Sequence, residues 1–214
     1  MIVNEPVTGS IAIINGYLLG AIPMAYIVTC LLTGKDIRQI GGGNVGARNV
    51  FVEVNKAAGI FVAIFDIGKG AAAVAIAQWG LDLPPAFVWL AGIAAVVGHI
   101  WSVYLKFAGG NGLATSLGVF AVTMGWELLI AFGIMAILFF INRRLILSLN
   151  TSLSTVPLSG WLLGSPWQSV VFSLALLLIM LAHYYPRVKQ AAVEAESKKA
   201  FVGELFRRKN AKRG

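Results

Sequence analysis

Two glycine-rich segments contain the residues of this sequence that are best suited to chemistry. The first reads Gly-Gly-Gly-Asn-Val-Gly-Ala-Arg-Asn over residues 41–49, and the second reads Lys-Phe-Ala-Gly-Gly-Asn-Gly over residues 106–112. Glycines let a backbone pass through positive φ and aim successive N–H groups at one point, which makes an anion site. The second segment also precedes an apolar helix expected from Leu113, and the N-terminus of a helix attracts phosphate. Two facing phosphate sites are therefore predicted, unless the glycines only let the loops turn at a membrane surface.

Four ionisable side chains elsewhere in the chain are candidates for buried roles. Asp66 and Lys69 are three residues apart, so a helix places them on one face, where they can pair. Ionisable groups at membrane depth are costly and usually face the bundle interior or a polar cavity. The pair is therefore predicted to fix helix packing or to orient the glycine-rich segments, with direct substrate contact as the alternative. His99 and His183 are each either a base or a hydrogen-bonded contact between helices.

The composition points to the lipid bilayer as the solvent of this chain. Of its 214 residues, 58% are hydrophobic and 12% are charged, whereas soluble domains carry about 25% charged residues. Crossings of about 20 residues each use nearly the whole length, which excludes a separate soluble catalytic domain. The single cysteine, Cys30, excludes an internal disulfide, and no Cys/His cluster has the spacing of a metal site. We therefore expect no metal and no cofactor and, because the basic residues serve topology, no nucleic acid.

Uninterrupted apolar runs predict an all-α integral membrane protein with seven transmembrane helices. The run over residues 113–141 is too long for one upright helix, because it rises about 43 Å against a hydrocarbon core of about 30 Å. Gly125, Trp126 and Glu127 in its middle are typical of a turn at a membrane surface, so we divide the run in two. The seven predicted helices lie near residues 11–32, 57–79, 85–105, 113–124, 128–142, 145–163 and 167–185.

The distribution of charge predicts the side of the membrane that each loop occupies. Cytoplasmic loops are enriched in Lys and Arg, and seven crossings put every basic residue except Lys69 on one face. The N-terminus is therefore expected outside and the C-terminus in the cytoplasm. Residues 1–186 form the expected membrane domain, and residues 187–214 form a basic tail, either a surface helix on anionic lipid or a solvated segment. The charged residues on the opposite face are all acidic: Glu5, Asp82 and Glu127.

Four motifs along the chain occur in an order that a known enzyme family shares. They are Gly43-Asn44-x-Gly46-Ala47-x-Asn49-Val50, Phe65-Asp66-x-x-Lys69-Gly70, Gly98-His99-Ile100 and Phe107-x-Gly109-Gly110-x-Gly112-x-Ala114-Thr115. From about Leu19 to His183 the sequence resembles the bacterial acyl-phosphate:glycerol-3-phosphate acyltransferases, the PlsY family. The resemblance implies seven membrane helices and an active site at the cytoplasmic face of the inner membrane. It also implies transfer of an acyl group from acyl phosphate to the 1-position of glycerol 3-phosphate, giving lysophosphatidic acid.

The resemblance and the loops together imply roles for particular residues. Ser148, His183 and Asn44 are the expected catalytic residues. Asp66, Lys69 and His99 are expected to support the structure. The expected substrates are acyl phosphate and glycerol 3-phosphate, and the expected partner of the protein surface is membrane lipid. The expected phosphate-binding residues are Gly43, Asn44, Gly46, Arg48, Asn49, Gly109, Gly110, Asn111, Gly112, Thr115, Arg143 and Arg144.

Several loop positions depart from the family pattern. The family normally has Ser at position 42, Thr at 48, Arg at 52, Lys at 108 and 111, and Asn at 186. Losing one charged phosphate contact costs on the order of 1.5 to 3 kcal/mol unless another residue replaces it. The candidate replacements are Arg48, Arg143 and Arg144. The residues that stand at the six positions are Gly42, Arg48, Val52, Ala108, Asn111 and Pro186.

Three functions are compatible with these features. The first is a working acyltransferase in which the three arginines take over phosphate binding. The second is a catalytically inactive family member that acts as a lipid-binding or regulatory membrane protein. The third, a transporter or channel for a small anion, is weaker, because the sequence shows no internal repeat and no broken helix at mid-membrane.

Overall fold

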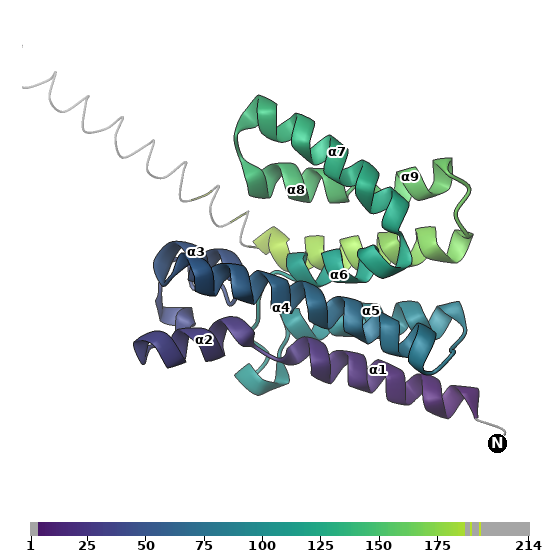
Figure 1. Ribbon diagram of the computed structural model, residues 1–214, viewed down its shortest axis with the longest axis horizontal. Helices are drawn as coiled ribbons and strands as arrows, with labels where there is room; N and C mark the ends of the chain where they lie inside the picture. Colours follow the sequence, from purple (N-terminus) through teal and green to yellow (C-terminus); the bar gives the residue numbers. More distant parts are fainter. Residues whose placement is uncertain (1–3, 187–188, 190–192, 194–214) are drawn as a thin grey trace, which may run out of the picture. The chain divides into compact units, whose positions relative to one another are not determined.

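The computed structural model describes residues 4–186, 189 and 193, and all regular secondary structure in these residues is helical. The structure divides after Met180 into two units, which are described separately. The larger unit holds the labelled helices α1 to α9 (Figure 1). The basic tail predicted over residues 187–214 lies outside the described residues, apart from positions 189 and 193.

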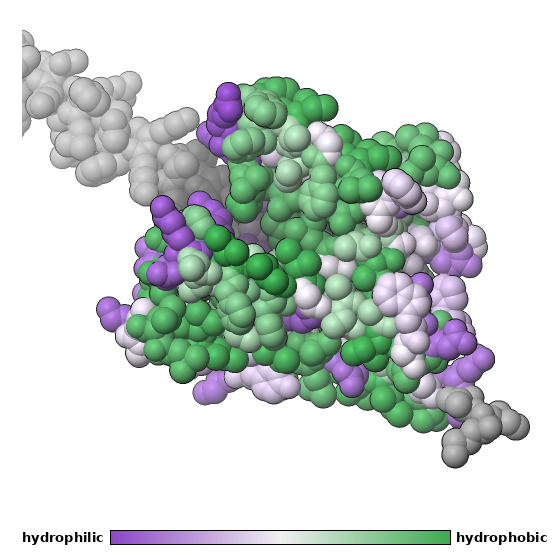
Figure 2. Space-filling view, in the orientation of Figure 1, coloured by the Kyte–Doolittle hydropathy of each residue, from purple (hydrophilic) through white to green (hydrophobic). Residues whose placement is uncertain are grey.

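Five helices in the described residues are long and apolar enough to cross a membrane. Each covers an apolar segment that the sequence predicts as a crossing. One more apolar helix, α6 (Leu113–Thr123), has only 11 residues. Figure 2 shows broad green areas, because large apolar side chains cover much of this face. The five long helices are Glu5–Thr33, Lys56–Gly80, Pro85–Leu105, Gly125–Asn142 and Trp167–Pro186.

The first long helix is broken, which the sequence analysis did not expect. It consists of α1 (Glu5–Ala21) and α2 (Met24–Thr33), separated by Ile22 and Pro23. Proline has no N–H and its ring clashes with a preceding carbonyl, so it interrupts a helix. The crossing predicted over 11–32 therefore corresponds to two half-helices within the candidate span Glu5–Thr33 rather than to one continuous helix.

The predicted helix over residues 145–163 is also wrong, because the segment forms two short helices. They are α8 (Leu145–Leu153) and α9 (Val156–Leu162). Between them, Ser154 Oγ donates to the Thr151 carbonyl at 2.6 Å and Thr155 Oγ1 donates to the Ser152 carbonyl at 2.7 Å. Such local side-chain bonds offer the backbone an alternative to a continuous helix.

The division of the long run over 113–141 is observed, but one residue earlier than expected. Helix α6 ends at Thr123 and α7 (Gly125–Asn142) begins directly after Met124, whose φ of −143° and ψ of 56° break the helix. The expected turn at residues 125–127 is instead the first turn of α7. Glu127 is consequently buried, with 6% of the residue exposed.

Close backbone contacts pack the central helices. Helix α1 lies along α5 (Pro85–Ile100), and α4 (Lys56–Ala75) lies along α6 (Figure 1). A Cβ on Gly20 would overlap the Ala95 carbonyl oxygen, and a Cβ on Gly118 would overlap the Ile67 carbonyl oxygen. Small residues let membrane helices approach this closely. These contacts therefore hold α1 against α5 and α4 against α6.

The connections within the larger unit lie at two ends (Figure 1). One end holds α2, the loop helix α3 (Ala47–Glu53) and the α7–α8 turn. The opposite end holds the start of α1, the π-helical end of the second long helix (η2, Ile76–Gly80), the α6–α7 break and the end of α9. Exposed tryptophans are typical of a membrane–water interface. Four of them, each 68–77% exposed, belong to elements of the opposite end: Trp79, Trp126, Trp161 and Trp167.

Candidate active site at the glycine-rich loops

A buried ion pair joins the helix break to α4. Lys69 Nζ lies 2.7 Å from Asp66 Oδ1 and donates to the Ile22 carbonyl at 3.0 Å. Both charged side chains are 2% exposed. A carbonyl at a helix end has lost its intrahelical partner and needs another donor. Lys69 therefore balances the charge of Asp66 and donates to the Ile22 carbonyl at the same time, which is the predicted pairing of Asp66 and Lys69.

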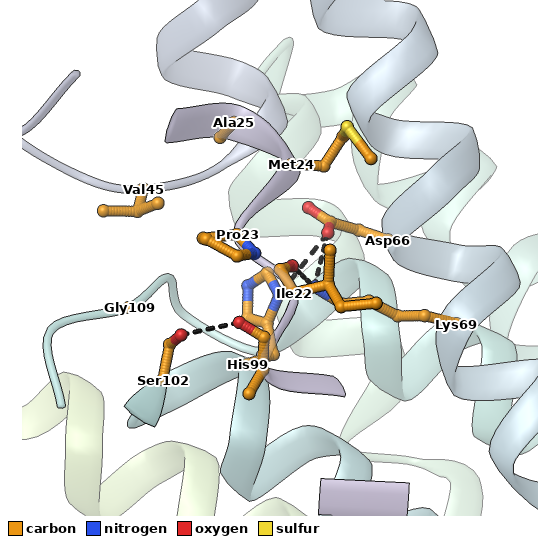
Figure 3. Close-up of a pocket in the computed structure, with 11 residues that line it drawn as sticks. Ile22, Pro23, Met24, Ala25, Val45, Asp66, Lys69, His99, Ser102 and Gly109 are labelled. Atoms are coloured by element: carbon orange, nitrogen blue, oxygen red, sulfur yellow. Dashed lines mark hydrogen bonds and ion pairs between the residues drawn. The ribbon is translucent and has the colours of Figure 1, made fainter. Parts of the chain in front are cut away.

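His99 connects this ion pair to the second glycine-rich loop. Its Nδ1 lies 3.6 Å from Asp66 Oδ1, and its backbone carbonyl accepts from the Gly110 N–H at 3.0 Å. A Cβ on Gly110 would overlap His99 Nε2, so this ring nitrogen faces the loop. Figure 3 shows Asp66 and Lys69 directed toward His99, with Ser102 and Gly109 beside it. His99 was expected to be either a base or a contact between helices, and this geometry favours the contact.

The space inside this cluster is small. It is lined by the ion pair, His99, the helix break, Val45, Ser102 and Gly109, and about 10 Å³ is free for the centre of a water molecule. That is close to the least that one water requires. This space is too small for a substrate molecule, which favours a supporting role of the cluster over direct substrate contact.

The two glycine-rich loops contact each other. A Cβ placed on Gly110 would lie 2.5 Å from the Val45 carbonyl oxygen, and one on Gly109 would lie 2.6 Å from the Ile100 carbonyl oxygen. Only glycine permits such an approach of backbone to backbone. The sequence prediction that the two loops come together is consistent with this contact.

Asn49 holds the first loop from inside. Its Nδ2 donates to the backbone carbonyls of Ile40 at 2.9 Å and Asn44 at 3.1 Å, with the Ile37 carbonyl at 3.4 Å. The residue is 8% exposed. Its amide nitrogen thus binds the protein's own backbone. The predicted phosphate contact of Asn49 would have to use another atom.

Some of the amides expected to form anion cradles are already used in turns. The Gly43 N–H donates to the Ile40 carbonyl, and the Gly46 N–H donates to the Asn44 carbonyl, both at 3.0 Å. Gly46 precedes α3, whose first residue is Ala47. The first loop is therefore a set of short turns leading into a helix, which the sequence analysis did not foresee.

The N-terminus of α6 keeps the features of an anion site. Gly112 adopts φ +82° at the N-cap position, and no side chain caps the helix. Thr115, in the first turn, is fully buried, and its Oγ1 has no hydrogen-bond partner among the described residues. Uncapped N–H groups and the helix dipole together favour an anion.

Basic side chains near the first loop differ in their partners. Arg38 forms an ion pair with Asp36, with Nη2 2.6 Å from Oδ2. The hydrogen bond from Arg38 lowers the pKa of the Asp36 carboxyl below its usual range and raises the pKa of Arg38. Arg48 is exposed on α3, and none of the ion pairs of the described residues involves it. Arg48 is therefore the basic side chain of this loop that an anion meets without displacing a carboxylate.

The turn between α7 and α8 forms a separate polar cluster. Ser148 is fully buried, and its Oγ donates to Asn142 Oδ1 at 3.1 Å. The same oxygen accepts from the Arg144 N–H at 2.7 Å. Arg143 and Arg144 are exposed, and the Arg143 guanidinium lies 5.7 Å from the Phe140 ring centre. The turn lies at the same end as α3 (Figure 1). Asn142 was missed in the sequence because amides are common in loops.

Positions that depart from the family pattern differ in their surroundings. A Cβ on Gly42 would meet no atom within 4 Å, so a side chain fits there. Val52 on α3 is 60% exposed. Ala108 is exposed, and Asn111 is half-buried. His183 and the exposed Pro186 belong to the smaller unit and lie on the last helix, Trp167–Pro186.

The fold and this cluster define the class of protein. It is a multi-pass integral membrane protein whose polar candidate site is formed by two glycine-rich loops next to apolar helices. The sequence profile described as glycerol-3-phosphate acyltransferase matches residues 10–192. The chain belongs to this family, which confirms the resemblance and the all-helical membrane fold class.

Known relatives span most of this chain. The glycerol-3-phosphate acyltransferase of Endomicrobium trichonymphae is 38% identical over 87% of this chain and 93% of its own length. Glycerol-3-phosphate acyltransferase 1 of Dehalococcoides mccartyi is 39% identical over 79% of this chain and 84% of its own length. The crystal structure of PlsY, an integral membrane glycerol 3-phosphate acyltransferase, in its glycerol 3-phosphate form is 27% identical, with a TM-score of 0.79, over 87% of this chain and 93% of that one. Its lysophosphatidic acid form gives a TM-score of 0.77 at 25% identity and the same coverage.

Removing either partner of the buried ion pair should destabilise the protein more than removing both. Asp66→Asn or Lys69→Met alone leaves a buried charge without its partner, and we expect the free energy of unfolding to fall by about 3 to 5 kcal/mol. The double variant should lose less than the sum of the two. Thermal unfolding in detergent measures the difference, with the exposed Lys56→Met as control. Additive losses would contradict the coupling.

Proposed function

We propose that this chain transfers an acyl group from acyl phosphate to the 1-position of glycerol 3-phosphate, giving lysophosphatidic acid. Family membership supports the reaction class. The observation that carries the proposal is the contact between the two glycine-rich loops beside the uncapped N-terminus of α6. Donor and acceptor each carry a phosphate, and two adjacent loops suit the two phosphates.

The chemistry needs no covalent enzyme intermediate, because the donor is already activated. The 1-hydroxyl oxygen forms a bond to the acyl carbonyl carbon, and the bond from that carbon to the phosphate oxygen breaks. The hydroxyl proton passes to a substrate phosphate oxygen, and phosphate leaves. The protein's part is to position the two substrates and to stabilise the developing negative charge.

The proposed roles follow from which groups are exposed and which are already bonded. Arg48, the N-terminus of α6 with Thr115, and the second loop bind phosphate. Asn49 holds the first loop rather than binding phosphate through its amide nitrogen. Asn44, Ser148 and His183 remain the proposed catalytic residues. The glycines at 43, 46, 109, 110 and 112 shape the loops. Asn111, Arg143 and Arg144 are proposed to bind phosphate at the edge of the loops.

We propose seven crossings of the bacterial inner membrane, with the N-terminus outside and the loops and tail in the cytoplasm. The basic loops lie at one end of the described helices, and the exposed tryptophans belong to the other (Figure 1). The short α6 and the α8–α9 pair make two of the crossings. The short α6 rises about 17 Å, less than the hydrocarbon core of about 30 Å, so it crosses together with the residues that flank it.

A single cysteine tests this orientation. In a Cys30→Ala background, Asp82→Cys should react with a membrane-impermeant thiol reagent on intact cells, because it lies in the connection between η2 and α5. Ala108→Cys should react only after the cells are permeabilised. The reverse pattern of labelling would overturn the orientation.

Arg48 should contribute strongly to turnover. Purified protein in detergent should convert glycerol 3-phosphate and palmitoyl phosphate to lysophosphatidic acid. Arg48→Ala removes a charged phosphate contact, and we expect kcat/KM to fall roughly ten- to 150-fold. Lys56→Ala, which removes an exposed lysine at the start of α4, serves as the matched control. An unchanged kcat/KM in Arg48→Ala would exclude the proposed role of this arginine.

The second candidate is a catalytically inactive family member that binds lipid or regulates phospholipid synthesis. Val52 favours it, because an exposed valine stands where the family has a cationic side chain. Folded wild-type protein without turnover would support this candidate.

Restoring two family residues separates the candidates. Gly42 has open space and Val52 is exposed, so Gly42→Ser with Val52→Arg should fold normally. If the wild type is a weakened enzyme, we expect kcat/KM to rise at least tenfold, because a charged hydrogen bond is regained. The lysophosphatidic acid assay measures this, with Gly133→Ser, another open glycine, as control. No gain in an active protein would show that the chain uses a different phosphate site.

A further inference from the structure

A groove separate from the glycine-rich loops lies at the opposite end of the larger unit. It has a volume of about 610 Å³ and is lined by Trp126, Glu127, Leu129, Ile130, Leu163 and Ser165. This volume is within the range of roughly 300 to 1,000 Å³ that small-molecule sites show. The first two turns of α7 form one wall, and the chain after α9 forms the other.

The apolar walls of this groove are not covered by other parts of the described chain. Trp126 is 77% exposed, Leu129 59% and Leu163 56%. In a membrane protein such surface meets the hydrocarbon of lipid. The acyl chain of a lipid is therefore a suitable partner for these apolar walls.

A single carboxylate lies among these apolar walls. Glu127 is 6% exposed, and its Oε1 accepts a hydrogen bond from Ser165 Oγ. None of the ion pairs among the described residues includes Glu127. A buried carboxylate is costly unless a cation or several donors satisfy it. One hydroxyl and the dipole of α7 satisfy it only in part, so the carboxylate is complementary to a cation that enters the groove.

We propose that this groove binds a membrane phospholipid whose headgroup carries a primary ammonium. The ammonium donates to Glu127 and lies against the Trp126 ring, and one acyl chain follows Leu129, Ile130 and Leu163. A primary ammonium has three donors and is attracted to the face of a tryptophan ring. This site is independent of acyl transfer, because it lies at the other end of the helices from the glycine-rich loops.

The lining of the groove discriminates among headgroups. A phosphoglycerol headgroup carries net negative charge and no cation, so Glu127 repels it. A quaternary ammonium has no N–H and forms no hydrogen bond with the carboxylate. The prediction is therefore a preference for phosphatidylethanolamine over both phosphatidylglycerol and phosphatidylcholine.

Native mass spectrometry of the purified full chain tests the proposal. The protein is released from detergent after addition of dioleoyl phosphatidylethanolamine, phosphatidylglycerol or phosphatidylcholine. We expect one molecule of phosphatidylethanolamine to be retained in preference to the other two lipids. Glu127→Gln keeps an acceptor for Ser165 but removes the charge, and it should lower retention at least tenfold. Glu5→Gln, an exposed carboxylate of α1, should leave retention unchanged.

The aromatic wall is tested with a second matched pair. Trp126→Ala should weaken retention, whereas Trp161→Ala, which removes another exposed tryptophan, on α9 and outside the groove, should not. Equal retention by the wild type and Glu127→Gln would overturn the proposal. So would retention of the three lipids in equal amounts, or a dimer in which a second copy covers the groove and excludes lipid.

Discussion

The buried contact of Lys69 with Asp66 and with the Ile22 carbonyl is the constraint on which the rest of the structure depends. A helix broken inside an apolar bundle exposes a carbonyl, and a carboxylate buried beside it carries an uncompensated charge. One ammonium donates to the carbonyl at 3.0 Å and lies 2.7 Å from the carboxylate, whose charge it balances. His99 lies next to Asp66 through its ring and accepts the Gly110 N–H through its carbonyl, so the second glycine-rich loop lies against the same cluster.

The glycines of the two loops serve packing as much as binding. Gly109 and Gly110 lie against the carbonyls at the end of α5 and against Val45, so side chains there would force the loops apart. The amides of Gly43, Gly46 and Gly110 bind backbone carbonyls. The proposed phosphate binding therefore rests on the start of α6 and on the exposed Arg48, with the loops as their support.

Apolar runs and charge spacing predicted much of this arrangement. Segment positions followed from hydropathy, and the pairing of Asp66 with Lys69 followed from helical spacing. The break at Ile22 and Pro23 did not follow from hydropathy, because the run around it is apolar throughout; its signal in the sequence is Pro23, and the lysine that binds the Ile22 carbonyl is 47 residues away. The inward direction of Asn49 was likewise hidden, since it depends on three carbonyls that only the folded loop brings together. The division between α8 and α9 was missed because serine and threonine are neutral in a hydropathy scan.

The break in the first long helix also has a consequence for how the protein is made. Chains enter the membrane from the N-terminus during synthesis, so α1 and α2 are inserted before α4 has left the ribosome. Until Lys69 arrives, the Ile22 carbonyl accepts only the Met24 N–H of the break itself. The contacts that hold the break thus come from later parts of the chain, with Lys69 on α4 bound to the Ile22 carbonyl and Ser102 after α5 bound to the Ala21 carbonyl.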